Sequence, residues 1–390
     1  MESKTAGVSG KDAPETGEAL PGADGKGEAA SPTSVEAPED QRAEVQDGSS
    51  ADALLGFSQE ELLGFLRRML LYRRFEEKAE EAYAIGKIGG FCHLHIGQEG
   101  SAEGAIRPLR KNDYVIAAYR EHTQALAKGV EPRLVMAELY GRAPGASGGK
   151  GGSMHVFGVD QGFMGGHGIV GGQVPLATGM GWAIKYRGED RVVVCFMGEA
   201  AVNQGALHEA LNMAAIWELP VVYVVENNEY GMGTAFSRVS ATEIVDRSSA
   251  YGIPASVVDG QDVLATYRHF EELSNEARSG GGPRFVEVRT YRFRGHSMSD
   301  PVAGTYRSKE EVAEHKAHDD PINILRDRLF EAGLLTQEEL EELDASVRAE
   351  VQEAADFADG APLPDPSDLY THVYSQINEH GRLFFDGKAG

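Results

Sequence analysis

A carboxylate and an amide each follow a strand-like run of apolar residues. Glu199 comes shortly after RVVVCFM (residues 191–197), and Asn228 comes shortly after PVVYVV (residues 220–225). Parallel strands joined by one crossover helix end at the same edge of a sheet, so we expect these two side chains to lie close together. A carboxylate, an amide oxygen and a backbone carbonyl form an oxygen-only half-site that suits Mg²⁺ with water and phosphate oxygens. Amides following Glu199 at a helix N-terminus would favour a diphosphate.

Two other glycine-rich stretches also invite a phosphate hypothesis. The stretch GASGGKGGS (145–153) fails as a P-loop because Pro144 stands where the first glycine belongs and Gly151 where Ser or Thr belongs. Residues 166–171 (GHGIVG) fit G-x-G-x-x-G, but the preceding VFGVDQGFM (156–164) is not strand-like, as a dinucleotide fingerprint requires. For all three segments, a capped helix, polar turn or loop without ligand is the alternative interpretation.

The elements that must position these residues can be recognised from periodicity and turn signals. RVVVCFM, a helix over Gln204–Trp217 and PVVYVV form a βαβ unit, which predicts an α/β fold with a mostly parallel sheet flanked by helices. Ser58 and Glu61 have capping-box spacing and begin a helix that runs to about Ile85. The other expected elements are a helix over Val263–Arg278, a strand over Arg284–Phe293 and C-terminal helices over Pro321–Phe357.

Composition excludes several classes of protein. The 390 residues include 61 acidic and 37 basic side chains, for a net charge of −24, which argues against nucleic acid as the main partner. No apolar run approaches the roughly 20 residues that span a bilayer, so we expect no membrane association. Cys92 and Cys195 are too few for a disulfide framework or a cysteine-rich zinc site. We therefore expect a cytoplasmic globular protein.

The first 56 residues differ in composition from the rest. They contain no aromatic residue and carry 12 acidic against 4 basic side chains, which predicts a disordered acidic tail. They have neither the arginine content of a transit peptide nor the apolar stretch of a secretory signal. The acidity that remains on the folded part suits either a salty cytoplasm or a basic patch on a partner.

Glu199 and Asn228 belong to a longer series of short motifs. Gly198-Glu199 … Asn227-Asn228 is similar to the thiamin-diphosphate signature, which begins Gly-Asp-Gly and ends Asn-Asn. Seven further motifs occur in family order: GFCHL (90–94), GQE (97–99), AYR (118–120), GKGGSMH (149–155), GIVG (168–171), YGMGT (230–234) and GHSMSDP (295–301). Together they resemble the α subunits of pyruvate dehydrogenase E1, within the thiamin-diphosphate-dependent 2-oxoacid dehydrogenase family. The resemblance covers residues 57–375, which would form one thiamin-diphosphate-binding domain and leave 376–390 as a C-terminal extension.

The resemblance implies how this chain would hold its cofactors, thiamin diphosphate and Mg²⁺. Glu199, Asn228 and the carbonyl of Tyr230 would bind the metal. Diphosphate and ring contacts would come from Tyr119, Arg120, the amides of Ala200 and Ala201, and the backbone of Gly168 and Val170.

It also implies which residues would surround the reacting centre. His93 and His296 would contact the cofactor and act as catalytic residues, one of them as proton donor to a lipoyl sulfur. Phe91 would line the substrate pocket, and Ile169 or Val170 would support the bent cofactor from below. Ser297 matches a serine that is phosphorylated in mammalian relatives, and residues 291–306 would order over the diphosphate.

The implied activity is oxidative decarboxylation of pyruvate with acetyl transfer to the lipoyl group of an E2 acetyltransferase. The family takes the carboxylate that activates the cofactor from a β subunit, so we expect an α₂β₂ heterotetramer and no activity of this chain alone. Glu199 and Ala200 depart from the usual Asp and Gly, which leaves an acetoin or branched-chain 2-oxoacid enzyme as an alternative. An ATPase, an NAD enzyme and a non-catalytic scaffold are the alternatives from other classes.

Overall fold

A six-stranded sheet forms the centre of the computed structural model, which describes residues 54–371. Every neighbouring pair of its strands is parallel. In spatial order the strands are β2 (Phe163–His167), β1 (Tyr114–Ala118), β3 (Val193–Gly198), β4 (Val221–Asn227), β8 (Arg284–Arg289) and β7 (Ala255–Asp259). The predicted α/β class with a parallel sheet is confirmed.

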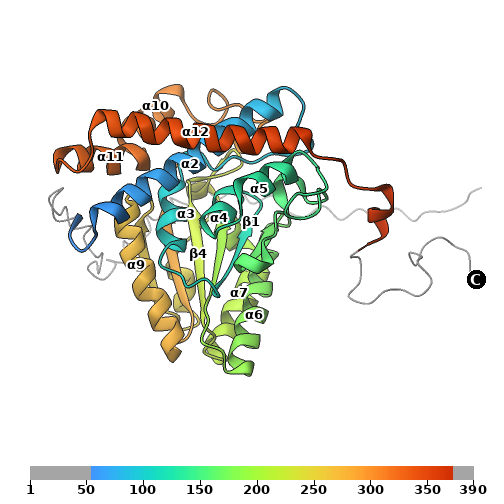
Figure 1. The fold of residues 1–390 in the computed structure, drawn as a ribbon. Coiled ribbons are helices and arrows are strands. Elements are labelled where there is room, and N and C mark those ends of the chain that lie inside the picture. The colour runs from blue at the N-terminus through green and yellow to red at the C-terminus, as the bar shows by residue number, and fades with distance from the viewer. Residues whose placement is uncertain (1–53, 372–390) are drawn as a thin grey trace, which may run out of the picture. The chain divides into compact units, whose positions relative to one another are not determined.

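Helices cover both faces of the sheet, which is why its central strands are apolar on both sides. Along β3, Val193, Cys195 and Met197 pack with α6 (Gln173–Arg187) and α7 (Gly205–Ile216). The alternate residues Val194 and Phe196 belong to the core on the opposite face. Eight α-helices of the described residues contribute to that core: α2 (Gln59–Ala84), α3 (Glu99–Ile106), α4 (His122–Ala127), α5 (Pro132–Leu139), α9 (Val263–Glu276), α10 (Lys309–His318), α11 (Pro321–Glu331) and α12 (Gln337–Gly360). The long helix α12 runs beside α2 and α5 (Figure 1).

The register of β3 and β4 places their ends level with each other. Val193 pairs with Val221 at one end, and Gly198 pairs with Glu226 at the other. Both strands begin with continuous buried apolar runs, VVCFM in β3 and VVYVV in β4, as expected of strands buried on two faces. The residues that follow them, Glu199 and Asn228, therefore start from neighbouring positions at the same sheet edge.

The expected helices are confirmed, with ends shifted by up to three residues. Ser58 accepts a hydrogen bond from the backbone N–H of Glu61, and the carboxylate of Glu61 accepts one from the backbone N–H of Ser58, which completes the predicted capping box of α2. The strand expected over Arg284–Phe293 is too long, because β8 ends at Arg289. Beyond it the chain leaves the sheet, and the N–H of Phe293 bonds to the carbonyl of Ile96.

Strand β2 was missed by the sequence analysis. The expectation that no strand precedes Gly166 is wrong, since Phe163–His167 pairs with β1 at the edge of the sheet. An edge strand is paired on one side only, so FMGGH forms one without the β-branched run that marks a central strand. Gly168 therefore lies in the loop between the strand β2 and the helix α6.

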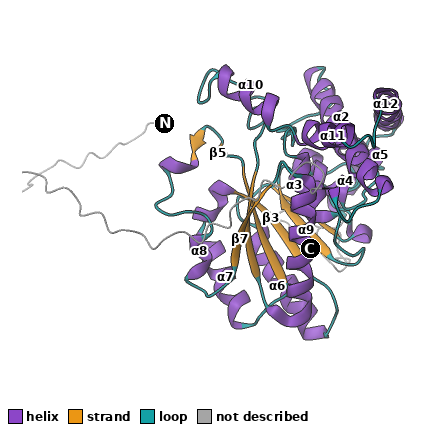
Figure 2. Cartoon of the chain, turned by 90° about the vertical axis from the view of Figure 1, so that its left-hand side faces the viewer, coloured by secondary structure: helices purple, strands orange, loops and turns teal. Residues whose placement is uncertain are grey.

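Several segments complete the fold outside the sheet layers. The hairpin of β5 (Tyr230–Gly231) and β6 (Thr234–Ala235) follows β4, and the helix α10 (Lys309–His318) follows β8. Both lie beyond the ends of these strands (Figure 2). The short helix α8 (Asp246–Ser249) precedes β7. None of the helices within residues 54–371 is both long and apolar enough to cross a membrane.

The expected terminal segments fall largely outside the described residues. This applies to positions 1–53 of the predicted tail and to the whole predicted extension, 376–390. Residues 54–56, which the sequence analysis assigned to the tail, already belong to the folded part. Leu54 is buried in the core, and its carbonyl accepts a hydrogen bond from the N–H of Phe57.

Candidate functional site

A cavity of about 810 Å³ lies where β1, β2, β3 and β4 end. All of the residues assigned above to the metal, the cofactor and the substrate pocket line it: Phe91, His93, Tyr119, Arg120, Gly168, Val170, Glu199, Ala200, Ala201, Asn228, Tyr230 and His296. Ile169 does not line the cavity, and its side chain is 77% exposed. Of the two apolar residues proposed as a support for the cofactor, Val170 therefore has the suitable position.

The strand order explains why the cavity forms here. The chain moves from β1 outward to β2 and then returns to the other side of β1 to form β3. In open α/β sheets, such a reversal leaves a crevice outside the carboxyl ends of the strands. Tyr119 and Arg120 follow β1, Glu199 follows β3 and Asn228 follows β4, so side chains from three sequence-distant segments reach this crevice.

The three predicted metal ligands gather around one point. The backbone N–H of Asn228 donates to Oε2 of Glu199 at 3.4 Å. The side-chain Nδ2 of Asn228 donates to Oε1 of Gln98 at 3.1 Å, which leaves its Oδ1 for a cation or donor. Arg292 Nη1 lies 3.3 Å from that Oδ1 and 3.5 Å from the carbonyl oxygen of Tyr230.

Burial makes this cluster unfavourable for an isolated negative charge. Glu199 is 2% exposed, and burial raises the pKa of its carboxyl, an effect that backbone hydrogen bonds and the guanidinium of Arg292 partly offset. Within residues 54–371, no group of three or more His, Cys, Asp or Glu side chains could hold a metal ion. A cation bound at Glu199 would therefore need the amide and carbonyl oxygens, completed by oxygens from a ligand.

Arg120 places a positive charge in the same cavity. Its Nη1 and Nη2 donate to the carbonyls of Leu94 and His296, at 2.7 and 2.8 Å. No carboxylate of the described chain forms an ion pair with it. Burial, together with the charge of Arg292, lowers the pKa of Arg120 to about 10, so the guanidinium stays charged at neutral pH. Such a partly buried cation, with no carboxylate partner among the described residues, is suited to an anionic ligand.

The segment after Glu199 differs from the expected helix N-terminus. Residues Glu199–Asn203 form a short 3₁₀ turn, and α7 begins only at Gly205. Anion binding here would rest on individual N–H groups of Ala200 and Ala201 rather than on the dipole of a long helix. Ala200 does not adopt positive φ, which explains why alanine is tolerated where glycine is usual.

His93, His296 and Tyr119 form an aromatic cluster beside Arg120. The ring centroids lie 4.6 Å apart for His93 and Tyr119, and 5.1 Å apart for the two histidines. Burial and the charge of Arg120 lower the pKa of His93 to about 2 and that of His296 to about 3. Both imidazoles are therefore neutral at pH 7, and the expected role as a proton donor would require a change in their surroundings.

A buried chain of polar groups supports His93 from below. His122 Nδ1 lies 2.8 Å from Glu76 Oε2, and its Nε2 lies 2.9 Å from Ser153 Oγ. Ser153 Oγ in turn accepts a hydrogen bond from the backbone N–H of His93 at 3.3 Å. This order of residue types resembles a nucleophilic triad, but Ser153 is only 3% exposed and does not line the cavity. The three residues position His93.

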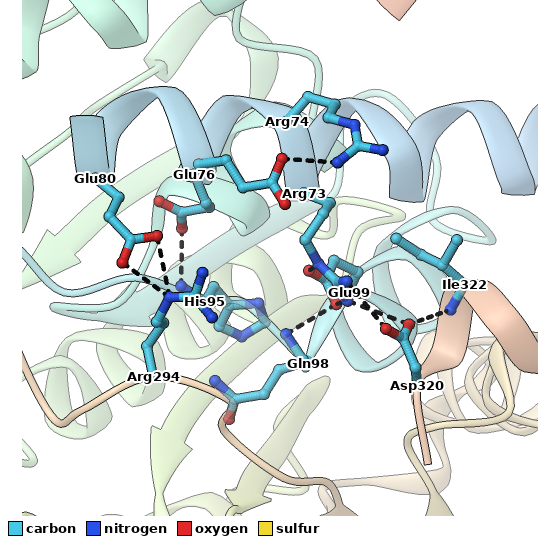
Figure 3. A network of polar contacts seen from close by, with 12 residues as sticks. Arg73, Arg74, Glu76, Glu80, His95, Gln98, Glu99, Arg294, Asp320 and Ile322 are labelled. Atoms are coloured by element: carbon cyan, nitrogen blue, oxygen red, sulfur yellow. Dashed lines mark hydrogen bonds and ion pairs between the residues drawn. The ribbon is translucent and has the colours of Figure 1, made fainter. Parts of the chain in front are cut away.

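Helix α2 anchors the segment that carries His93 and Gln98 (Figure 3). The N–H of His95 donates to Glu76 Oε1 at 2.9 Å, and that of Gly97 donates to Glu99 Oε2 at 3.0 Å. Arg73 on α2 pairs with both Glu99 and Asp320, at 2.5 and 3.0 Å. These contacts hold Gln98 within hydrogen-bond distance of Asn228.

Sequence reasoning missed several polar residues that line the cavity: Gln98, Gln124, Gln173, Gln204, Glu226, Arg292 and Asp300. Gln98 lies inside the GQE motif and Asp300 inside the GHSMSDP motif, so these two motifs were the signal that could have identified them. Glu226 is the second-last residue of β4 and is held by His95 Nε2 at 3.1 Å and Ser101 Oγ at 2.6 Å. Nothing in the sequence distinguishes Arg292 from the arginines around it.

The glycine-rich loop 145–153 binds a carboxylate side chain of the same protein. The carboxylate of Glu138, on α5, accepts hydrogen bonds from four backbone N–H groups of this loop. The donors are those of Ser147, Gly149, Gly151 and Gly152, at 2.6 to 3.1 Å from the carboxylate oxygens. With its donors occupied, the loop has a structural function, which agrees with the rejection of a P-loop.

Comparison with known proteins gives consistent similarities. The dehydrogenase E1 component family matches residues 67–367. A pyruvate dehydrogenase E1 component subunit alpha from Rhizobium meliloti is 51% identical over 308 residues, which cover 79% of this chain and 88% of that protein. Proteins of the same description from Zymomonas mobilis and Rickettsia felis are 50% and 47% identical, over 79% and 78% of this chain and 86% and 93% of their own.

Proposed function

The chain belongs to the dehydrogenase E1 component family, and we propose that it works as the α subunit of a pyruvate dehydrogenase E1. In this role it takes part in the oxidative decarboxylation of pyruvate and in acetyl transfer to the lipoyl group of E2. The single observation that carries the proposal is the pairing of opposite charges in one cavity. The partly buried guanidinium of Arg120, which pairs with no carboxylate of the described residues, lines the same cavity as the oxygen cluster of Glu199, Asn228 and Tyr230.

The cavity fits thiamin diphosphate, on which the family depends. Among the described residues, four buried polar atoms of cavity-lining side chains have no hydrogen-bond partner: His93 Nδ1, Gln98 Nε2, Gln124 Oε1 and Gln173 Oε1. Unpaired buried polar atoms are costly in a folded protein, so their presence around one cavity favours a polar ligand. The arrangement of an anion site next to a cation site further favours a metal-bound diphosphate.

We assign the contacts of the diphosphate and metal as follows. Glu199, Asn228 and the carbonyl of Tyr230 would hold Mg²⁺. Arg120 and Tyr119 would bind the terminal phosphate, with Arg120 supplying fixed donors. The amides of Ala200 and Ala201 would complete this part of the site, and the backbone of Gly168 and Val170 would bind the aminopyrimidine ring.

The bound cofactor supplies the nucleophilic carbon and the electron sink that decarboxylation of a 2-oxoacid requires. The residues of this chain bind, orient and exclude water around that reaction. His93 and His296 offer neutral imidazole nitrogens as hydrogen-bond donors or acceptors to the reacting groups. Phe91, at the cavity wall, would limit the space for the substrate side chain. The buried Glu76–His122–Ser153 chain keeps His93 in place.

The site also indicates why a β subunit is needed. The carboxylates that line the cavity within the described residues are Glu199, Glu226 and Asp300. Glu199 is assigned to the metal, Glu226 is held by His95 and Ser101, and Asp300 accepts from the N–H of His296 and the hydroxyl of Tyr306. We propose that the carboxylate that activates the cofactor comes from β in an α₂β₂ assembly.

The reconstituted complex tests this function directly. We expect the full chain, co-purified with its β subunit, to decarboxylate pyruvate with thiamin diphosphate and Mg²⁺, and the chain alone to show no turnover. Activity of the isolated chain at the rate of the complex would contradict the assignment of the missing carboxylate to β. Loss of activity with chelator and its recovery with Mg²⁺ would test the metal.

A related substrate is the second candidate, and Glu199 is the observation that favours it. The family usually has Asp at this position, and branched-chain 2-oxoacid dehydrogenases share Glu. Turnover of pyruvate, 2-oxoisovalerate and acetoin by the same complex would distinguish the enzymes. If kcat/KM for 2-oxoisovalerate or acetoin exceeds that for pyruvate by an order of magnitude, that compound replaces pyruvate as the proposed substrate.

We further propose that the protein works in the cytoplasm. Cys92 and Cys195 are both free and buried, which suits a reducing compartment. Cell fractionation with an antibody to the chain would test this location.

A further inference from the structure

Arg292 lies where the proposed metal would bind. Its side chain is 1% exposed, and Nη1 lies 3.3 Å from Asn228 Oδ1 and 3.5 Å from the carbonyl oxygen of Tyr230. These are two of the three oxygens assigned to Mg²⁺. The charge of Arg292 also acts on the third, since it counteracts the burial that raises the pKa of Glu199.

The other contacts of Arg292 hold it in place. Nε donates to the carbonyl of Arg294 at 3.0 Å, and Nη2 donates to the hydroxyl of Tyr306 at 3.1 Å. Nη2 also donates to the carbonyl of Met232, in the turn between β5 and β6, at 3.4 Å. These contacts fix the guanidinium beside the proposed metal ligands.

A guanidinium at this position opposes a divalent cation at the same oxygens. Each amide or carbonyl oxygen has two lone pairs, so those of Asn228 and Tyr230 can accept from Arg292 and still bind Mg²⁺. The two positive charges, however, repel each other strongly at this separation in a buried site. Arg292 therefore lowers the affinity of the cluster for a free metal ion.

We propose that the charge of Arg292 makes metal binding at this site depend on the diphosphate, an inference that rests on the proposed function. Its guanidinium bonds to the oxygens of Asn228 and Tyr230 and repels a second cation placed beside them. Free metal ion therefore binds weakly to this chain. Loading of the site is favourable only when a diphosphate contributes further negative charge and oxygen ligands.

Mn²⁺ binding to the full-length α₂β₂ complex, stripped of thiamin diphosphate and metal, tests the proposal. Free Mn²⁺ is measured by electron paramagnetic resonance, which does not depend on activity. Arg292→Gln removes the charge, Arg292→Met is a second uncharged variant, and Arg292→Lys keeps the charge. Arg294→Gln is the matched control, since Arg294 pairs with Glu80 and does not contact a proposed metal ligand.

Without thiamin diphosphate, the uncharged variants should bind Mn²⁺ at least about 10-fold more tightly than the wild type. The Arg292→Lys and Arg294→Gln complexes should resemble the wild type. An unchanged or weaker affinity in Arg292→Gln and Arg292→Met, or an equal gain in Arg294→Gln, would overturn the role of Arg292. Circular dichroism identifies any variant that does not fold, and the other uncharged variant then decides.

A parallel titration with thiamin diphosphate separates this inference from the proposed function. If the wild type binds Mn²⁺ with the cofactor but the uncharged variants gain nothing without it, only the role of Arg292 fails. If the wild type binds no Mn²⁺ even with thiamin diphosphate, the metal assignment fails, and the inference with it.

Discussion

The backbone N–H of Asn228 donates a hydrogen bond to Oε2 of Glu199 over 3.4 Å, across the ends of two adjacent parallel strands. The two residues belong to the loops after β4 and β3, and their separation in the sequence is bridged by α7. This contact shows that the two halves of the proposed metal site meet. The site therefore depends on the parallel register of β3 and β4 as much as on the identity of either residue.

Replacing Glu199 with alanine should abolish metal-dependent cofactor binding. The change removes the only charged ligand among the three proposed, and we expect thiamin diphosphate affinity in the presence of Mg²⁺ to fall by more than about 10-fold. Isothermal titration calorimetry of the α₂β₂ complex measures it. Glu209→Ala, at an exposed glutamate on α7, is the control and should bind normally. Unchanged binding in Glu199→Ala would displace the metal assignment.

Replacing Glu76 with glutamine should destabilise the protein. Glu76 and His122 are both fully buried, and breaking such a pair costs about 3 kcal/mol or more in free energy of unfolding. Urea denaturation measures the cost. Glu77→Gln is the control, because its half-exposed pair with Arg74 should contribute less than about 1 kcal/mol.

The effect of Glu76→Gln should also depend on pH. Burial opposes the charged form of His122, but the carboxylate of Glu76 outweighs burial and raises the pKa of the imidazole. A raised pKa stabilises the fold below the unfolded value of about 6.5, and this contribution is lost as the pH rises through the folded pKa. The difference between wild type and Glu76→Gln should therefore shrink at high pH. A difference that grows with pH would contradict the charged pair.

His93 and His296 should have the opposite effect on how the stability of the fold changes with pH. Burial lowers the pKa of His93 to about 2 and that of His296 to about 3, below the unfolded value of about 6.5. The unfolded chain binds more protons below pH 6.5, so the fold loses stability as the pH falls from there. Replacement of His93 with asparagine should reduce this loss, as measured by urea denaturation at pH 7 and pH 5.

Nuclear magnetic resonance of ¹³C-labelled histidine rings gives a direct measurement of the same groups. The signals of His93 and His296, assigned through their asparagine variants, should not titrate between pH 8 and pH 5 in the absence of cofactor. Titration of either ring with a midpoint near 6.5 would show that the imidazole is solvated and would remove the basis for the pH dependence.

Replacing Glu311 with alanine should weaken the metal site from outside the cavity. Glu311 Oε1 accepts hydrogen bonds from the hydroxyls of Tyr230 and Tyr291, at 3.0 and 2.7 Å. Its removal should loosen the loop that presents the carbonyl of Tyr230, at a cost of about 1 to 2 kcal/mol, or roughly 10-fold in Mn²⁺ affinity with cofactor present. The neighbouring Glu310→Ala is the control, and equal effects of both variants would refute the specific contact.

How far the sequence predicts the structure depends on how local each feature is. β3 and β4 were recognisable because a strand buried on both faces needs a continuous apolar run. The edge strand β2 has no such requirement and was missed. The chain Glu76–His122–Ser153 joins residues from three distant segments, and no spacing in the sequence indicates that they meet.

The sequence by itself determined the family of this protein and part of the residues that line its cavity, because short motifs in a defined order specify both. Only the tertiary structure decided the other lining residues and what all of them contact. It placed the guanidinium of Arg292 beside two proposed metal ligands, paired Arg120 with no carboxylate of the described residues and bound Glu138 to the loop 145–153. The physical reason is that long charged side chains are directed by the packing of distant segments, whereas strands and caps are determined by their immediate neighbours in the chain.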